Sequence, residues 1–207
     1  MVAKMAVMWS AASFCTYLSQ MLNKYLEGTI FINNYLEGFA GIIGNYFAVI
    51  IYSRLGVRGA FLASMGITLA GASLIYLFEA GILDPSIAVN MGLTSKSLDP
   101  KGSLEANEQY LSALIPIFGF ITKIGNNISF LNCYQASFSN ETVFPILRRA
   151  TATGICNFVA RTLTICAPMA AELERPAPVK YLCIVAFIAW TVALSLPSHD
   201  SEMQAQL

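Results

Sequence analysis

The sequence predicts an all-helical integral membrane protein, and three observations support this. Charged residues make up 12% of the 207 residues, whereas ordinary soluble domains contain about 25%. Hydrophobic residues reach 56%, and the mean hydropathy is +0.61. The apolar runs extend for about twenty residues, the length of a membrane-spanning helix, without the alternation that a membrane β-strand requires. The net charge of zero leaves no basic surface for nucleic acid.

Six apolar runs are long enough to be membrane-spanning helices. They cover residues 6–22, 30–52, 60–78, 111–136, 150–171 and 179–196. A polar segment at 79–109 separates the first three runs from the last three, and residues 197–207 form a polar tail. Loops longer than about 15 residues are usually functional or disordered, but no motif identifies a role for the segment 79–109.

The fifth run contains polar and small residues at helical spacing. Gly154, Asn157, Arg161, Thr164 and Pro168 follow one another at offsets of three or four, which places them on one side of a helix. An arginine inside a membrane-spanning helix is unfavourable unless it faces protein or water. The pattern therefore predicts that this helix lines a cavity.

The first run has a similar polar stripe. Ser13, Tyr17, Gln20 and Lys24 are spaced by four, three and four residues, so they share one helical face. We expect this helix to line the same kind of aqueous space.

Two further charges lie inside apolar runs. Glu37 lies about 10 Å into the second run at 1.5 Å per residue, and Lys123 shares a helical face with Asn126 and Asn127 in the fourth run. Glu37 either pins two helices together through an ion pair or contacts a proton or substrate. One specific alternative is that Glu37 neutralises Arg161 and leaves Lys123 uncompensated.

The residues that usually perform catalysis or bind metals form no recognisable pattern. All five cysteines lie in apolar runs without a paired spacing, so we expect them to fill the core. These are Cys15, Cys133, Cys156, Cys166 and Cys183. The single histidine, His199, lies alone in the tail. The sequence predicts no catalytic residue, no metal site and no cofactor.

Three segments resemble a known family of transporters. FPILRRATATGICNFVAR, followed by APMAAEL, resembles the region around the eleventh helix of major facilitator superfamily carriers. TKIGNNISF, followed by Tyr134, resembles the tenth helix of their organic cation and organic anion branch, and SRLGVRG resembles the loop between the eighth and ninth helices. The resemblance implies that the six runs are helices seven to twelve, the carboxy-terminal half of a twelve-helix bundle. Such carriers bind substrate between two six-helix halves near the membrane midplane.

The resemblance also implies roles for individual residues. Arg161 falls where this branch tends to have an arginine in anion carriers, so it would be the main counter-charge for a substrate, and Lys123 would be a second. The other substrate contacts would be Asn157, Asn127, Tyr17, Gln20 and Ser13. Residues with gating or helix-pairing roles would be Glu37, Arg54, Arg58 and Arg149.

The leading hypothesis is transport of small organic ions, preferably anions, by alternating access in a multi-pass protein of the plasma membrane. The partners would be the solute, the lipid bilayer, and either a missing amino-terminal six-helix half or a second copy. Nucleic acid is not an expected partner. The alternatives are a sugar-porter-like or other major facilitator carrier, a non-transporting half-bundle that acts as a subunit or regulator, and a fragment of a longer carrier.

Overall fold

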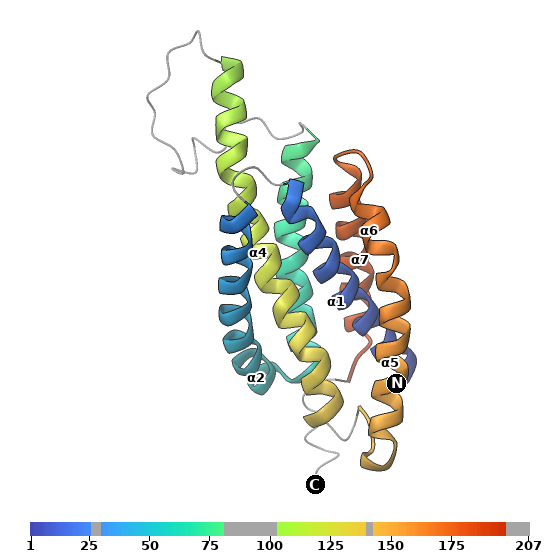
Figure 1. The fold of residues 1–207 in the computed structure, drawn as a ribbon. Coiled ribbons are helices and arrows are strands. Elements are labelled where there is room, and N and C mark those ends of the chain that lie inside the picture. The colour runs from blue at the N-terminus through green and yellow to red at the C-terminus, as the bar shows by residue number, and fades with distance from the viewer. Residues whose placement is uncertain (26–29, 81–102, 140–142, 198–207) are drawn as a thin grey trace.

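The computed structural model describes residues 1–25, 30–80, 103–139 and 143–197, and within these ranges it is helical with no strand (Figure 1). The predicted all-helical class is therefore confirmed. In chain order the elements are α1 (Val2–Leu22), η1 (Asn23–Tyr25), α2 (Ile30–Glu79), α4 (Ser103–Ser139), η2 (Ile146–Arg148), α5 (Arg149–Thr164), α6 (Cys166–Ala171) and α7 (Ala177–Ala193). Two helical stretches, Asn34–Glu79 and Ile146–Ala171, are long and apolar enough to cross a membrane, and Ala177–Ala193 is a shorter apolar helix.

Helix α2 consists of two arms that meet at Gly56. This glycine has φ 65° and ψ −174°, a backbone conformation that is essentially restricted to glycine because a Cβ would clash there. The break lies inside the segment SRLGVRG, between the predicted runs 30–52 and 60–78. The first arm (blue in Figure 1) and the second arm (teal) join near one end of the bundle.

The helices pack side by side as a bundle, and Figure 1 shows one face of it. Helices α1 and α4 lie in the centre of this face, with the first arm of α2 on one flank and α5 on the other. Helix α7 lies behind α1 and α5, and it packs against both α1 and α2. We call the surface formed by α1, α4, the first arm of α2 and α5 the four-helix face.

An aromatic cluster holds α1 against α4. The Trp9 ring is almost completely buried, with its centroid 4.6 Å from that of Tyr134 and 6.3 Å from that of Phe130. Its indole Nε1 donates a hydrogen bond of 3.3 Å to Ser137 Oγ. Because a buried Trp N–H needs an acceptor, this bond fixes both the position and the orientation of the ring between the two central helices.

The two flanking helices pack through small residues. Helix α5 buries Ala152, Cys156 and Ala160, and the first arm of α2 approaches α4 at Gly44, where an added Cβ would lie 2.9 Å from the Asn127 Cβ. Small residues allow helix backbones to come close together. At Gly38, by contrast, an added Cβ would meet nothing within 4 Å.

Two element boundaries differ from the sequence prediction. Helix α4 begins at Ser103, inside the predicted loop 79–109. The residues that follow include Leu, Glu, Ala and Gln, which favour helix, while the polar residues among them keep the hydropathy of this stretch low. Residues 81–102 of that loop lie outside the described ranges. The predicted run 150–171 is divided at Ile165 between α5 and α6; Pro168 has no N–H to donate to the Thr164 carbonyl, which interrupts the helical hydrogen bonds there.

Candidate functional site

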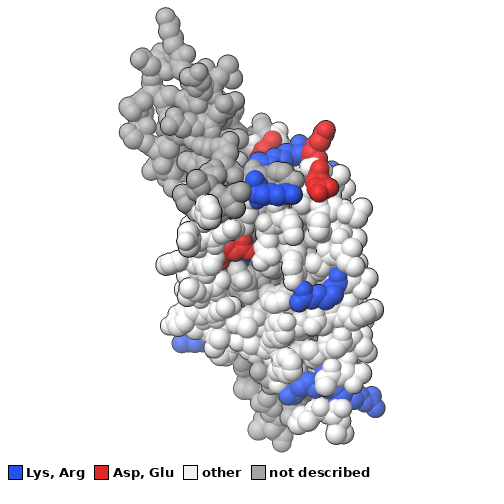
Figure 2. Space-filling model, viewed as in Figure 1, with Lys and Arg blue, Asp and Glu red and all other residues white. Residues whose placement is uncertain are grey.

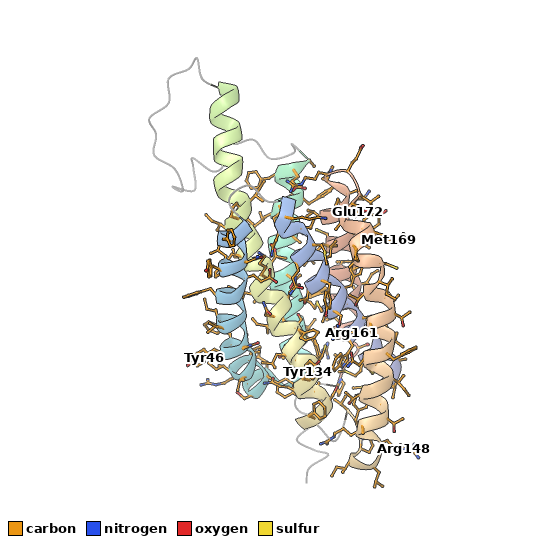
Figure 3. The ribbon with its side chains drawn as sticks, in the orientation of Figure 1. Tyr46, Tyr134, Arg148, Arg161, Met169 and Glu172 are labelled. Atoms are coloured by element: carbon orange, nitrogen blue, oxygen red, sulfur yellow. The ribbon has the colours of Figure 1, made fainter. Side chains whose placement is uncertain are left out.

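Arg161 lies on α5 and contacts α1 across the four-helix face (Figure 3). Its guanidinium donates a hydrogen bond to the Tyr17 hydroxyl and lies 5.5 Å from the centroid of the same ring. Guanidinium groups are attracted to the faces of aromatic rings. The polar stripes predicted on the first and fifth runs therefore meet at this pair, and the Arg161 side chain remains exposed.

Lys123 lies on the other side of the four-helix face, between α4 and α2. Its ammonium is 3.9 Å from Glu37 Oε2, and the two side chains are 8% and 22% exposed. Asn23, directly after α1, donates a hydrogen bond to the same carboxylate oxygen. The Glu37 carboxylate thus joins three parts of the chain, and the helix-pinning interpretation of Glu37 describes this arrangement.

This pairing corrects the alternative in which Glu37 neutralises Arg161. Glu37 is paired with Lys123, and Arg161 rests on Tyr17. The sequence predicts that Arg161 and Lys123 act together as counter-charges for one substrate. In the described parts of the chain the two cations have different partners, so Arg161 is the cation that is not offset by a carboxylate.

Asn126 connects three helices from a buried position. Its Nδ2 donates to the Cys15 carbonyl at 3.2 Å and to Ser19 Oγ at 2.9 Å, while its Oδ1 accepts a bond of 3.1 Å from Thr68. These bonds tie α4 to α1 and to the second arm of α2. The predicted substrate contact is Asn127 and not Asn126, because the sequence shows that the two amides share a face but not which of them faces other helices.

The remaining predicted contact residues occupy different environments. Asn127 donates to the Lys123 carbonyl at 2.9 Å, within its own helix. Gln20 is exposed on α1, and Asn157 is half-buried on α5. Ser13 is only 3% exposed, which corrects the prediction that it lines an open face, because the turn of α1 around Ser13 lies in the interior of the bundle.

The predicted gating arginines lie at the end of the bundle where α2 breaks. Arg149 Nη1 donates a 2.6 Å hydrogen bond to the Phe138 carbonyl, so it joins the start of α5 to the end of α4. A basic side chain at a helix C-terminus also interacts favourably with the helix dipole. Arg54 is exposed and Arg58 is half-buried, on either side of Gly56.

Sequence reasoning missed an ion pair at the opposite end. Arg175 Nη1 lies 3.5 Å from Glu79 Oε1, and the Glu79 side chain is 9% exposed. Both residues line a pocket of about 50 Å³ between α1, α2, α4 and α7, which is enough for a few water molecules. The available signal was an acid directly after the third apolar run and a base four residues before the sixth.

The described residues contain no group of histidine, cysteine or acidic side chains that could hold a metal ion. All five cysteines are free thiols. Cys15, Cys133 and Cys156 are buried as predicted, whereas Cys183 is half-buried and Cys166 is exposed. The core-filling prediction is therefore wrong for Cys166, which follows the α5 break and faces outward.

The comparisons with known proteins give no relative. No protein-family model matches the chain, and no curated protein and no solved structure matches it.

Proposed function

We propose that the bundle is a multi-pass membrane protein. Its exterior supports this, because large apolar side chains stand exposed on the first arm of α2 and along the segment from η2 to α6. Examples are Phe31 (76% exposed), Phe39 (64%), Leu147 (98%), Phe158 (74%) and Met169 (72%). Soluble monomers rarely expose contiguous apolar patches of this kind. Figure 2 shows a broad uncharged belt on the four-helix face, with most of the charged side chains near its two ends.

Within that membrane we propose transport of small organic ions, with anions preferred, by alternating access. The observation that carries the proposal is Arg161, an exposed guanidinium held on Tyr17 within the uncharged belt (Figures 2 and 3). An ionised side chain at membrane depth is unfavourable unless water or an opposite charge lies beside it. A water-filled pathway that binds an organic anion would provide both the water and the opposite charge.

The proposed carrier needs a second six-helix unit over the four-helix face, as in carriers built from two repeats that rock around a central site. Lys123 is offset by Glu37, so we assign the role of substrate counter-charge to Arg161. The Tyr17 ring beside it would stack on a flat apolar part of the solute. Gln20 and Asn157 provide nearby amides.

The test is uptake by the full chain expressed in cells or reconstituted in vesicles, with a panel of organic anions and cations. Arg161→Gln should abolish anion uptake at unchanged surface expression, while Arg161→Lys should retain part of it because the charge remains. If the unmodified chain carries neither anions nor cations in any assembly, transport is the wrong function. If it carries anions equally well after Arg161→Gln, the assignment of Arg161 is wrong.

A further inference from the structure

A groove of about 330 Å³ lies between α1, α5 and α7. Helices α5 and α7 both pack on α1 but hardly touch each other, so α1 forms the floor of the groove and the other two helices form its walls. The floor is hollow because several residues of α1 that line it are short, namely Ala6, Ser10 and Ala11. Protein pockets that hold small molecules begin at about 300 Å³, so the groove is large enough for part of a ligand.

The lining of this groove is apolar. Its walls consist of aliphatic side chains and one thiol, which belong to Val159 and Leu163 of α5, Cys166 of α6, and Val185 and Ile188 of α7. The one hydroxyl among the lining residues, that of Ser10, donates a 2.7 Å hydrogen bond to the Ala6 carbonyl in its own helix. A groove whose hydroxyl is already satisfied favours an apolar occupant over ordered water.

The groove opens on the side of α5 that faces away from Arg161. Val159 and Leu163 lie two residues before and two residues after Arg161, so each points about 160° around the helix from it at 3.6 residues per turn. Both are exposed, as is Ile188 on the opposite wall. Helix α7 lies behind α1 and α5 (Figure 1). A unit that covers the four-helix face would therefore leave this groove in contact with the surrounding lipid.

A cation stands at one end of the groove. Lys4 precedes Val7, Ala11 and Phe14 at offsets of three, four and three residues, so the four residues form one strip along α1, and the last three line the groove. Lys4 is exposed, and its Nζ donates a 2.7 Å hydrogen bond to the Ser195 carbonyl just after α7. Because an ammonium group has three donors, Lys4 can also donate to an anion at the mouth of the groove.

This end of the bundle, the lower end in Figure 1, has a basic surface. In the parts of the chain that the structure describes, the acids near the bundle ends lie at the opposite end, and they include Glu79, Glu172 and Glu174. Figure 2 shows basic patches and no acidic patch toward the lower end. Basic residues at a membrane surface attract anionic lipid headgroups. The basic residues of this end are Lys4, Arg54, Arg58, Arg148 and Arg149.

We propose that the groove between α1, α5 and α7 binds a glycerophospholipid with an anionic headgroup. One acyl chain lies on the floor of the groove between Val7 and Phe14, and the phosphate group lies on Lys4. The order of chemical groups along the groove carries this assignment, since a cation at the bundle end is followed by an apolar channel toward the bundle interior. A phospholipid has the same order, with a charged headgroup followed by an apolar chain.

The lipid would connect α5 to α7, which hardly touch each other without it. It would also fill the space behind α5, the helix that holds Arg161 in front. This inference rests on the proposed function only because it places the chain in a membrane. It does not require that the chain transports a solute.

The first test measures lipid binding to the purified chain by native mass spectrometry in detergent. Dioleoyl phosphatidylglycerol is the anionic probe, and dioleoyl phosphatidylcholine is the zwitterionic control with the same acyl chains. Phosphatidylglycerol should bind as one tight copy per chain, about fivefold more tightly than phosphatidylcholine. Equal affinities for the two lipids would overturn the proposal.

Four variants locate the site. Lys4→Gln should weaken phosphatidylglycerol binding about fivefold and leave phosphatidylcholine unchanged, whereas Lys4→Arg should retain the affinity. Ile188→Trp should fill the groove and abolish the tight copy. The matched control is Phe187→Trp, which changes an exposed residue of α7 that does not line the groove. Lys4 and Ile188 are exposed, so the core should remain intact. No effect of Lys4→Gln, or equal effects of the two tryptophan variants, would contradict the proposal.

The second test maps the acyl chain with a phosphatidylglycerol that has a photoreactive diazirine in one chain. The probe is a minor component of phosphatidylcholine vesicles that contain the full chain. Adducts should concentrate on residues 159–166 and 185–188, and not on Phe39 and Ile42 of the first arm of α2, which are also exposed. Even labelling of all these positions would reduce the lipid to part of the surrounding bilayer and would overturn the site.

The outcomes also separate this inference from the proposed function. A chain that binds phosphatidylglycerol in the groove but transports no solute would reject transport alone. A chain that transports anions but binds the two lipids equally would reject the lipid site alone. Particles of two chains that contain no tightly bound lipid would assign the groove to a second copy and would also reject the lipid site.

Discussion

Lys123 of α4 lies 3.9 Å from Glu37 of α2, and both side chains are largely buried. Each charge is separated by more than one helical turn from the nearest end of its helix, where water would stabilise it. Removal of one member therefore leaves the other without its counter-charge in a medium of low dielectric constant. The pair joins the first arm of α2 to α4, and in the proposed carrier it leaves Arg161 as the charge available to a solute.

The first prediction concerns the stability of this pair. Glu37→Gln should lower the free energy of unfolding by about 2 kcal/mol, less than the roughly 3 to 5 kcal/mol typical of a broken buried pair, because Glu37 keeps some contact with solvent. Lys123→Met should have a similar effect. Thermal unfolding of the purified protein in detergent measures both.

The double variant provides the control for this prediction. When both charges are removed no unpaired charge remains, so Glu37→Gln with Lys123→Met should be less destabilised than the sum of the two single variants. Strictly additive losses would show that the two side chains act independently.

The second prediction tests the contact between α2 and α4. Gly44→Ala should destabilise the protein by about 1 to 2 kcal/mol, because the new methyl group would lie 2.9 Å from the Asn127 Cβ and 3.2 Å from the Ile124 carbonyl oxygen. Gly38→Ala is the matched control, since its methyl group meets nothing within 4 Å. It should raise stability by about 0.5 kcal/mol through the better helix propensity of alanine. Equal effects at the two positions would contradict the close approach at Gly44.

The third prediction concerns the buried amide of Asn126. Asn126→Leu removes bonds to two other helices and should lower stability by about 2 kcal/mol, given that interhelical bonds in membranes contribute about 0.6 kcal/mol each and that the leucine is larger than the site. Asn127→Leu should have a smaller effect because the Nδ2 of Asn127 bonds only within α4. The unfolding midpoints of the two variants in the same detergent show which variant is less stable. If Asn127→Leu is the less stable of the two, Asn126 does not hold the three helices together.

The fourth prediction separates the two contacts of Tyr17 with Arg161. Tyr17→Phe removes the hydroxyl but keeps the ring, so anion affinity in the uptake assay should fall by about threefold or less. Tyr17→Leu removes the ring as well and should weaken affinity by about tenfold, since cation–π contacts contribute roughly 0.5 to 2 kcal/mol. The KM for anion uptake, compared at equal surface expression, measures both. If the two variants behave alike, the ring does not help to position the guanidinium.

Much of the fold could be predicted because it depends on local patterns. The helical class follows from long apolar runs, and the break between the arms of α2 lies in the segment SRLGVRG, between two predicted runs. The contact of Arg161 with Tyr17 was partly predictable, since each residue lies on a polar stripe of its own helix. The start of α4 at Ser103 was missed because hydropathy does not register polar residues that favour helix.

The sequence by itself determined that the chain is helical, which residues share a helical face, and that charges occur deep within apolar runs. Only the tertiary structure decided the partners: Glu37 with Lys123, Arg161 with Tyr17, Asn126 with α1 and α2, and Glu79 with Arg175. The physical reason is that periodicity fixes the direction of a side chain relative to its own helix axis, whereas the choice of counter-charge depends on how closely small residues let two helices approach and on how each helix is rotated about its axis.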